Sequence, residues 1–270
     1  MLILLIFFLE SESYRINFSE KEIKGSQYLV HIYPLQTGIA KHRGLMASYL
    51  NGDSSFKEKL INTENQISEN IKIVQALPKQ FGTQESIDSI HKNWQALKGK
   101  RNLALEDSFN LHTQIIQQVL SLIVHVADQS NLILDPDLDT YYLMDLTIIA
   151  IPELIEALGK ARGGASAMAA SKQVSTNNIV ELNLYYNDIS RILSRTQASL
   201  STAFKSTHNN QLQSHLSKFE APLKNHIDTF LALIKNDIER ADNITIEASD
   251  VFNTGSQSIQ AAIQLLNNTA

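Results

Sequence analysis

Two arginines, Arg43 and Arg162, occur on the apolar sides of predicted helices, where a charged side chain is unusual. A guanidinium keeps its proton, so burying it without an acidic partner, backbone carbonyls or a bound anion is costly. Each arginine is followed by a glycine, Gly44 or Gly163, which would let a second backbone or a ligand approach closely. The spacing therefore predicts two inward-facing cations. The apolar residues in the same helical sectors are Ile32, Leu35, Ile39, Met46 and Leu50 in the first helix and Ile151, Leu154, Leu158, Ala165 and Ala169 in the later one.

Two kinds of partner could neutralise these cations. Structural salt bridges, for instance to Asp128 or Asp145, would close the arginines off. Alternatively, the fork of guanidinium donors matches a carboxylate or nitrate in two-point contact, which predicts an anion site between the helices. His42, Tyr49, Tyr142 and Asp145 complete the predicted ligand-binding set, although each tyrosine is also typical of a core residue with a satisfied hydroxyl.

The composition argues against several other functions. The chain has no cysteine, which removes disulfides, thiolate metal sites and cysteine nucleophiles. His42, His112 and His125 lie in no His-Glu-x-x-His or Glu-x-x-His pattern, and we predict neither a metal nor another cofactor. No serine elbow, phosphate-binding loop or dinucleotide fingerprint occurs, so an enzyme is not expected. The net charge of −5 includes no basic block, and nucleic acid is not an expected partner.

Repeated helical periodicity predicts an all-α fold. The separators between helical runs are short, so consecutive helices should pack antiparallel, with both termini at one end. Asp135 and Pro136 suit the N-cap and first position of a helix. Helices of about 30 residues are roughly 45 Å long, which favours an elongated pair of four-helix bundles that share long helices. The predicted helices are 19–50, 54–77, 83–97, 102–131, 136–171, 176–205, 211–239 and 247–266.

The chain begins with an apolar run, residues 1–9, which is followed at once by Glu10 and Glu12. A bilayer span needs about 20 apolar residues, so this run is too short to cross alone. No Lys or Arg precedes it, as a signal peptide would require. A buried first turn is one interpretation. We interpret residues 1–10 instead as the outer end of a truncated transmembrane helix, and residues 11–270 as an extracytoplasmic helical domain.

Three segments carry a family resemblance: residues 41–50 (KHRGLMASYL), 132–145 (LILDPDLDTYYLMD) and 158–163 (LGKARG). Together they resemble the extracytoplasmic helical sensor domains of bacterial methyl-accepting chemotaxis receptors, and they are similar to the nitrate- and nitrite-sensing helical group. The resemblance extends over about residues 19–266, and the middle segment is its most specific part.

The resemblance implies a homodimer of paired four-helix bundles in the periplasm, held to the inner membrane by flanking helices. It also implies that Arg43 and Arg162 bind a small anion and that binding displaces helices toward the membrane. His42 stands where a domain of this group can carry a second arginine, so short carboxylates are expected beside nitrate and nitrite. The alternative is a helical dimerisation or protein-recognition module without a small-molecule ligand, which arginines closed by salt bridges would favour.

Overall fold

The computed structural model describes residues 2–52, 54–134 and 137–269, with side chains from Phe7 onward. Within these ranges all regular elements are helical and no strand occurs, which confirms the all-α prediction. The first bundle contains α1 (Leu2–Leu50), α2 (Lys57–Gln75), α3 (Gln84–Leu97) and α4 (Leu105–Gln129), with short 3₁₀ turns at Ser54–Phe56, Lys79–Phe81 and Leu132–Leu134. The second contains α5 (Leu138–Asp145), α6 (Ile151–Ser171), α7 (Thr176–Ser206), α8 (Leu212–Ile234) and α9 (Ala248–Thr269).

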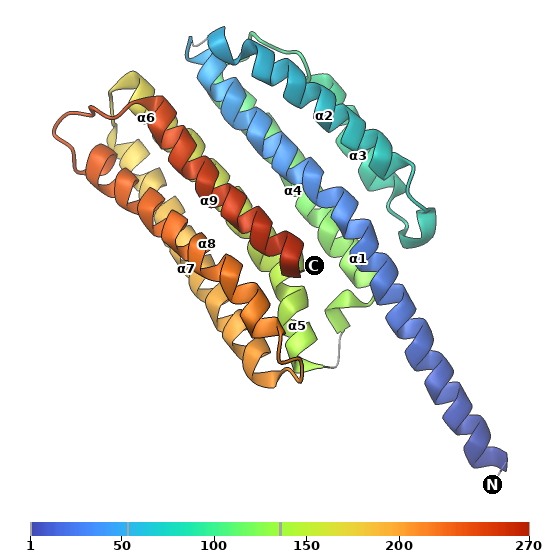
Figure 1. Cartoon of the computed structure of the whole chain (residues 1–270). Helices are drawn as coiled ribbons and strands as arrows, with labels where there is room; N and C mark the ends of the chain where they lie inside the picture. The colour runs from blue at the N-terminus through green and yellow to red at the C-terminus, as the bar shows by residue number, and fades with distance from the viewer. Residues whose placement is uncertain (1, 53, 135–136, 270) are drawn as a thin grey trace.

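The two bundles lie side by side and form an elongated molecule (Figure 1). They meet along α1 and α6, which run in the same direction, and we call this contact the α1–α6 seam. The seam is the central layer of the molecule, because most of α6 is buried, including both polar and apolar side chains. The last helix, α9, points toward the same end as the start of α1, but α1 reaches much farther (Figure 1).

The first helix is longer than predicted, since it begins at Leu2 rather than near Ser19. Residues 2–24 contain neither proline nor glycine, so nothing in the sequence interrupts the helix there. None of the described helices carries an apolar stretch long enough to cross a bilayer. The assignment of residues 1–10 to a membrane helix stays a prediction.

The predicted long helix from Pro136 to Ser171 is one rod, described here from Leu138, with a π-helical turn at Leu146–Ala150. Asp135 and Pro136, the predicted cap, lie outside the described residues. Pro152 lies two residues after the π turn and cannot donate a backbone hydrogen bond, so a carbonyl in the preceding turn is left for another donor. Tyr33 Oη donates to the Thr147 carbonyl at 3.0 Å, and Gln36 Nε2 donates to the Pro152 carbonyl at 2.7 Å. The irregularity therefore joins α6 to α1.

Replacement of Tyr33 by phenylalanine should destabilise the protein, because it leaves the Thr147 carbonyl buried without a donor. The expected loss is about 1–3 kcal/mol in the free energy of unfolding, measured by urea denaturation. Tyr14→Phe is the matched control, since Tyr14 is 68 % exposed and its hydroxyl has water available. Equal unfolding midpoints for the two variants would contradict the role given to Tyr33.

Candidate functional site

Arg43 is buried in a closed salt bridge at the seam. Its side chain is 2 % exposed, and its two terminal nitrogens donate to the carboxylate of Glu156 on α6 at 2.8 and 2.9 Å. A further bond of 2.8 Å reaches Thr113 Oγ1, and the guanidinium lies 4.7 Å from the ring centre of Phe109. The prediction of an inward-facing Arg43 is confirmed, but its acidic partner is Glu156 rather than Asp128 or Asp145.

Arg162 is equally buried and has no carboxylate partner among the described residues. It is 4 % exposed, donates to Ser256 Oγ at 2.9 Å and to the Ala40 carbonyl at 3.3 Å, and lies over the ring of Phe252 at 4.4 Å. Its Nε is buried without an acceptor. Burial, and next the charge of Arg43, lower the pKa of Arg162 to about 9. Arg162 is therefore a cation at neutral pH whose charge the surrounding protein does not balance.

The surroundings of the two arginines repeat between the bundles. Each arginine lies over a phenylalanine ring and donates to a hydroxyl one helical turn after that phenylalanine. Both partners lie on the last helix of the arginine's own bundle. The two sets are Arg43, Phe109 and Thr113 in the first bundle, and Arg162, Phe252 and Ser256 in the second. The pattern Lys-x-Arg-Gly also occurs on both helices, at residues 41–44 and 160–163. An approximate two-fold operation thus exchanges α1 with α6 and α4 with α9.

Two glycines make room for the guanidiniums to cross the seam. A Cβ at Gly44 on α1 would lie 3.0 Å from an Arg162 terminal nitrogen, and a Cβ at Gly159 on α6 would lie 3.0 Å from one of Arg43. These contacts are tighter than ordinary packing, so a side chain at either position would push the arginine away. Gly163, which the sequence suggested as a close-approach position, instead faces the ring of Phe109.

The pseudo-symmetry fails at one position, and that position sets the charge balance. Glu156 lies six residues before Arg162, and the equivalent residue, six before Arg43, is Thr37. Thr37 only donates to carbonyls of its own helix, at Tyr33 and Pro34. Within the described part of the chain, one half of the seam therefore has a carboxylate beside its arginine and the other half has none.

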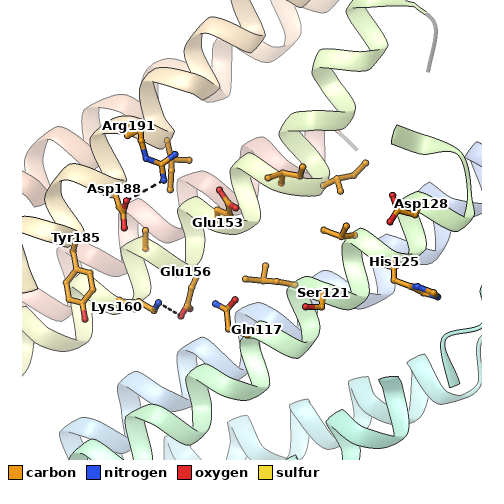
Figure 2. Close-up of a pocket in the computed structure, with 16 residues that line it drawn as sticks. Gln117, Ser121, His125, Asp128, Glu153, Glu156, Lys160, Tyr185, Asp188 and Arg191 are labelled. Carbon is orange, nitrogen blue, oxygen red and sulfur yellow. Dashed lines mark hydrogen bonds and ion pairs between the residues drawn. The ribbon is translucent and has the colours of Figure 1, made fainter. Parts of the chain in front are cut away.

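The grooves beside the seam reflect this difference. Between α4, α6 and α7 lies a groove of about 560 Å³, in which Glu156 and the half-buried Lys160 form an ion pair at 3.7 Å (Figure 2). A second groove, of about 520 Å³, lies between the pseudo-symmetry-related helices α1, α2 and α9. Lys41 and Lys59 line this second groove, which we call the basic groove, and the described residues of its wall include no acid.

A smaller cavity lies next to Arg162. It measures about 120 Å³ and is bounded by Gly44 and Phe252, both of which contact the Arg162 guanidinium, and by Ser166. The Ser166 hydroxyl is buried and has no hydrogen-bond partner. Ser166 lies one helical turn after Arg162, so its hydroxyl and the Arg162 Nε are two unsatisfied donors on one stretch of α6.

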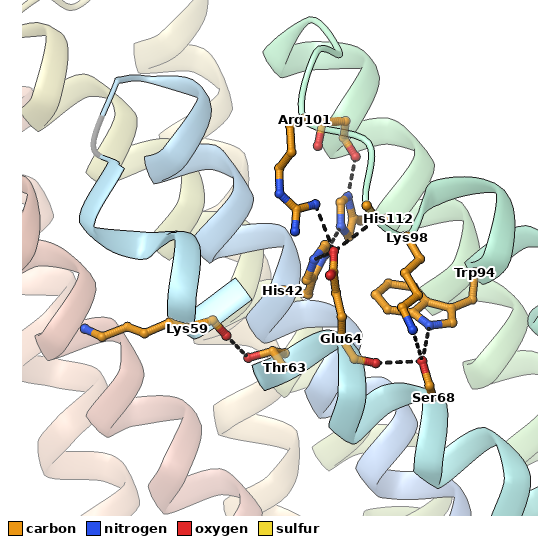
Figure 3. Close-up of polar contacts among 11 residues, drawn as sticks. His42, Lys59, Thr63, Glu64, Ser68, Trp94, Lys98, Arg101 and His112 are labelled. Carbon is orange, nitrogen blue, oxygen red and sulfur yellow. Dashed lines mark hydrogen bonds and ion pairs between the residues drawn. The ribbon is translucent and has the colours of Figure 1, made fainter. Parts of the chain in front are cut away.

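His42, a predicted ligand-binding residue, lies in the core of the first bundle (Figure 3). Its Nδ1 is 2.7 Å from His112 Nε2, and its Nε2 is 3.2 Å from Glu64. Glu64 also pairs with Arg101 at 2.8 Å and accepts from the Gly99 amide at 3.0 Å. The carboxylate thus has its own cation within the first bundle, and His42 is engaged by His112 and Glu64. No group of three or more His, Asp or Glu side chains in the described chain could hold a metal.

Of the other predicted site residues, Tyr142 and Asp145 lie apart from Arg162, whereas Tyr49 belongs to the same apolar cluster as Phe252. Tyr49 packs with Leu45 and Met46 at the end of α1. Tyr142 stacks on Tyr141 at 5.4 Å, and Asp145 pairs with Arg195 on α7. At 1.5 Å per residue, Tyr142 and Asp145 are about 25–30 Å along the rod from Arg162. The structure therefore brings neither of them to the unbalanced arginine.

Sequence reasoning missed the residues that distinguish the two arginines. The repeated Lys-x-Arg-Gly pattern was the available signal, because aligning its two copies places Glu156 against Thr37. Ser256 and Phe252 had no such signal, since only the fold brings α9 to α6. Comparison of the chain with protein-family models, with curated proteins and with solved structures gives no match.

The buried histidine network predicts a loss of stability in acid. Burial, and next the charge of His42, lower the pKa of His112 from 6.5 to about 3. The unfolded chain therefore binds the proton first, and stability should fall as pH decreases from about 6.5 to 3, by about 1 kcal/mol per pH unit. For Glu64, burial acts to raise the pKa, but bonds from His42, Arg101 and Gly99 lower it to about 2, so a further loss begins below about 4.5.

Urea denaturation across this pH range would measure the effect. His112→Asn should reduce the dependence between pH 6.5 and 4.5, because one of the two buried rings is gone; His42, whose pKa burial also lowers, remains. The exposed His208 provides the control, and His208→Asn should keep the wild-type slope. An unchanged slope in His112→Asn would show that other groups cause the acid dependence.

Proposed function

We propose that this chain is the sensor module of a signalling receptor and that it binds a small anion at Arg162. The observation that supports the proposal is the charge count at the seam, where two buried guanidiniums share one carboxylate. A buried cation without a counter-charge costs several kcal/mol, and a bound anion would offset that cost. The family resemblance in the sequence points to the same class of protein, with the periplasmic location and membrane attachment as further predictions.

The anion would take the two unsatisfied donors next to the small cavity, Arg162 Nε and Ser166 Oγ. A guanidinium edge and a hydroxyl together suit a planar anion with two or three oxygens. The cavity of about 120 Å³ limits the ligand to a few heavy atoms. Nitrate, nitrite, formate and acetate therefore fit the site, whereas dicarboxylates and phosphate esters are too large.

The basic groove supplies a route to the site. Phe56, Ser249 and Phe252 line both the groove and the small cavity, so the two spaces adjoin. Lys41 and Lys59 would attract an anion into the groove, because no described wall residue opposes their charge. The wall of the opposite groove has four acids, Asp128, Glu153, Glu156 and Asp188, against Lys160 and Arg191, so this groove would attract an anion less.

Binding could be transmitted through the contacts that Arg162 already makes. It bonds to the Ala40 carbonyl on α1 and to Ser256 on α9, and it lies against Gly44 on α1. An anion that draws the guanidinium toward Ser166 would shift these contacts, and so would bias the position of α1 relative to α6 and α9. Because α1 is one continuous helix from Leu2, a shift at the seam would extend along it.

The alternative, a helical module that binds no small molecule, finds support in the Arg43 half of the seam. There the salt bridge to Glu156 closes the site completely. Arg162 favours the sensor instead, since its half of the seam lacks the equivalent carboxylate.

Thr37→Glu is the most direct test, because it places a carboxylate at the position equivalent to Glu156. The new side chain should neutralise Arg162, raise the thermal midpoint and abolish anion binding. Isothermal titration against nitrate, nitrite, formate and acetate would measure affinity. In Thr37→Gln the new side chain has the size of glutamate but no charge, so this variant should bind the anion as the wild type does. Arg162→Ala should weaken binding by at least about tenfold, since a charged hydrogen bond contributes about 1.5–3 kcal/mol.

The two equivalent lysines provide a second matched pair. Lys41→Gln should slow anion association, whereas Lys160→Gln, at the same position of the opposite groove, should leave it unchanged. The proposal fails if no anion of the panel binds the wild type at millimolar concentration. It also fails if Thr37→Glu binds an anion as tightly as Thr37→Gln.

A further inference from the structure

His42 on α1 and His112 on α4 are two buried rings in direct contact, and we call them the histidine pair. Both are 0 % exposed, and His42 Nδ1 lies 2.7 Å from His112 Nε2 (Figure 3). The outer nitrogen of each ring faces an oxygen. His112 Nδ1 is 2.6 Å from the Ser108 carbonyl, and His42 Nε2 is 3.2 Å from Glu64 Oε1. The pair is thus the middle of a row of three polar contacts that has an oxygen at each end.

The two end oxygens fix the number of protons that this row needs. The Ser108 carbonyl can only accept a hydrogen bond, and so can an ionised Glu64, so both outer ring nitrogens must carry a proton. The inner contact needs one more proton, on either of its two nitrogens. Two neutral imidazoles carry one proton each. Three satisfied hydrogen bonds therefore require one proton more than the neutral pair has.

Glu64 does not supply the additional proton, because its surroundings keep it ionised. Its Oε1 accepts from the Gly99 amide at 3.0 Å and pairs with Arg101 at 2.8 Å. Burial acts to raise the pKa of Glu64, but the bonds from His42, Arg101 and Gly99 lower it to about 2. Toward His42 the carboxylate is therefore an acceptor only.

We infer that the histidine pair is a proton-binding switch, in which one shared proton makes the His42–Glu64 link between α1 and α2. Without that proton, one of the three contacts brings two lone pairs together. The His42–Glu64 contact is the longest of the three, so it is the one that breaks. A second proton would place two N–H donors face to face across 2.7 Å, so the pair takes up one proton and resists another.

The charges around the pair agree with a single proton. Burial lowers the pKa of His42, the bond to Glu64 acts against that lowering, and Arg101 adds to it. Burial, and next the charge of His42, lower the pKa of His112 to about 3, which separates the second proton from the first. The charged groups near the pair are Arg43 on α1, Glu64 on α2, and Lys98 and Arg101 after α3.

The switch lies directly beside the closed half of the seam. His42 and Arg43 are consecutive on α1, and their partners on α4, His112 and Thr113, are consecutive as well. A change in the His42 link therefore acts on the turn of α1 that holds the salt bridge to Glu156. This gives the fold a response to pH that does not depend on anion binding at the other half of the seam.

Nuclear magnetic resonance of ¹⁵N-labelled histidine counts the protons directly, because a protonated ring nitrogen differs in chemical shift from a bare one. At about pH 5 the pair should show three protonated nitrogens of four, whereas the exposed His208 should be a full imidazolium. His42→Asn and His112→Asn assign the signals. Two neutral rings, or two imidazolium rings, at that pH would overturn the proposal.

Glu64→Gln tests the end oxygen that requires the additional proton. The glutamine amide can donate to His42 Nε2, so two neutral rings would satisfy all three contacts, and the pair should hold no additional proton at about pH 5. Glu69→Gln is the matched control, because Glu69 lies on the same helix in an exposed pair with Lys72 and should not affect the count. An additional proton that persists in Glu64→Gln would contradict the proposal. The wild-type count decides the question even if this variant does not fold.

Discussion

The seam between α1 and α6 contains two buried guanidiniums and one carboxylate, and the rest of the structure is arranged around that imbalance. Arg43 is neutralised by Glu156, so that half of the contact is a closed structural pair. Among the described residues, Arg162 has a hydroxyl and a backbone carbonyl as acceptors and no carboxylate as a counter-charge. Such a charge can persist because the surrounding apolar core of both bundles stabilises the fold as a whole.

The seam also explains the irregular features of the helices. Glycine at positions 44 and 159 lets a guanidinium from the facing helix come within 3.0 Å of where a Cβ would lie. The π-helical turn before Pro152 leaves a carbonyl that Tyr33 satisfies, so a defect within one helix becomes a bond between two. Polar groups at the seam thereby fix the register of α1 against α6, since a shift of either helix would leave several of them unpaired.

Much of the fold could be predicted from the sequence because helices are local. Periodicity and short separators placed the ends of the helical rods within a few residues, apart from the start of the first, and they included the long rod that ends at Ser171. The inward direction of Arg43 and Arg162 followed from the same periodicity. Their partners did not, because α4 and α9 are distant in sequence and only packing brings Thr113 or Ser256 to an arginine. The start of α1 was also missed, since residues 7–24 bury no side chain against the bundles and so lack the broad apolar face of a core helix.

The two arginines occupy pseudo-symmetric positions but differ in their acidic partner. Two similar bundles that met through two identical contacts would have either two salt bridges or two unbalanced charges. Instead, a single change from Glu156 to Thr37 at equivalent positions makes one contact structural and leaves the other open. The closed contact holds the bundles together while the open one retains unsatisfied donors at Arg162 and Ser166. A small anion at the open contact would therefore change only one side of the seam, and the resulting asymmetry would act on α1, which is the helix that extends away from both bundles.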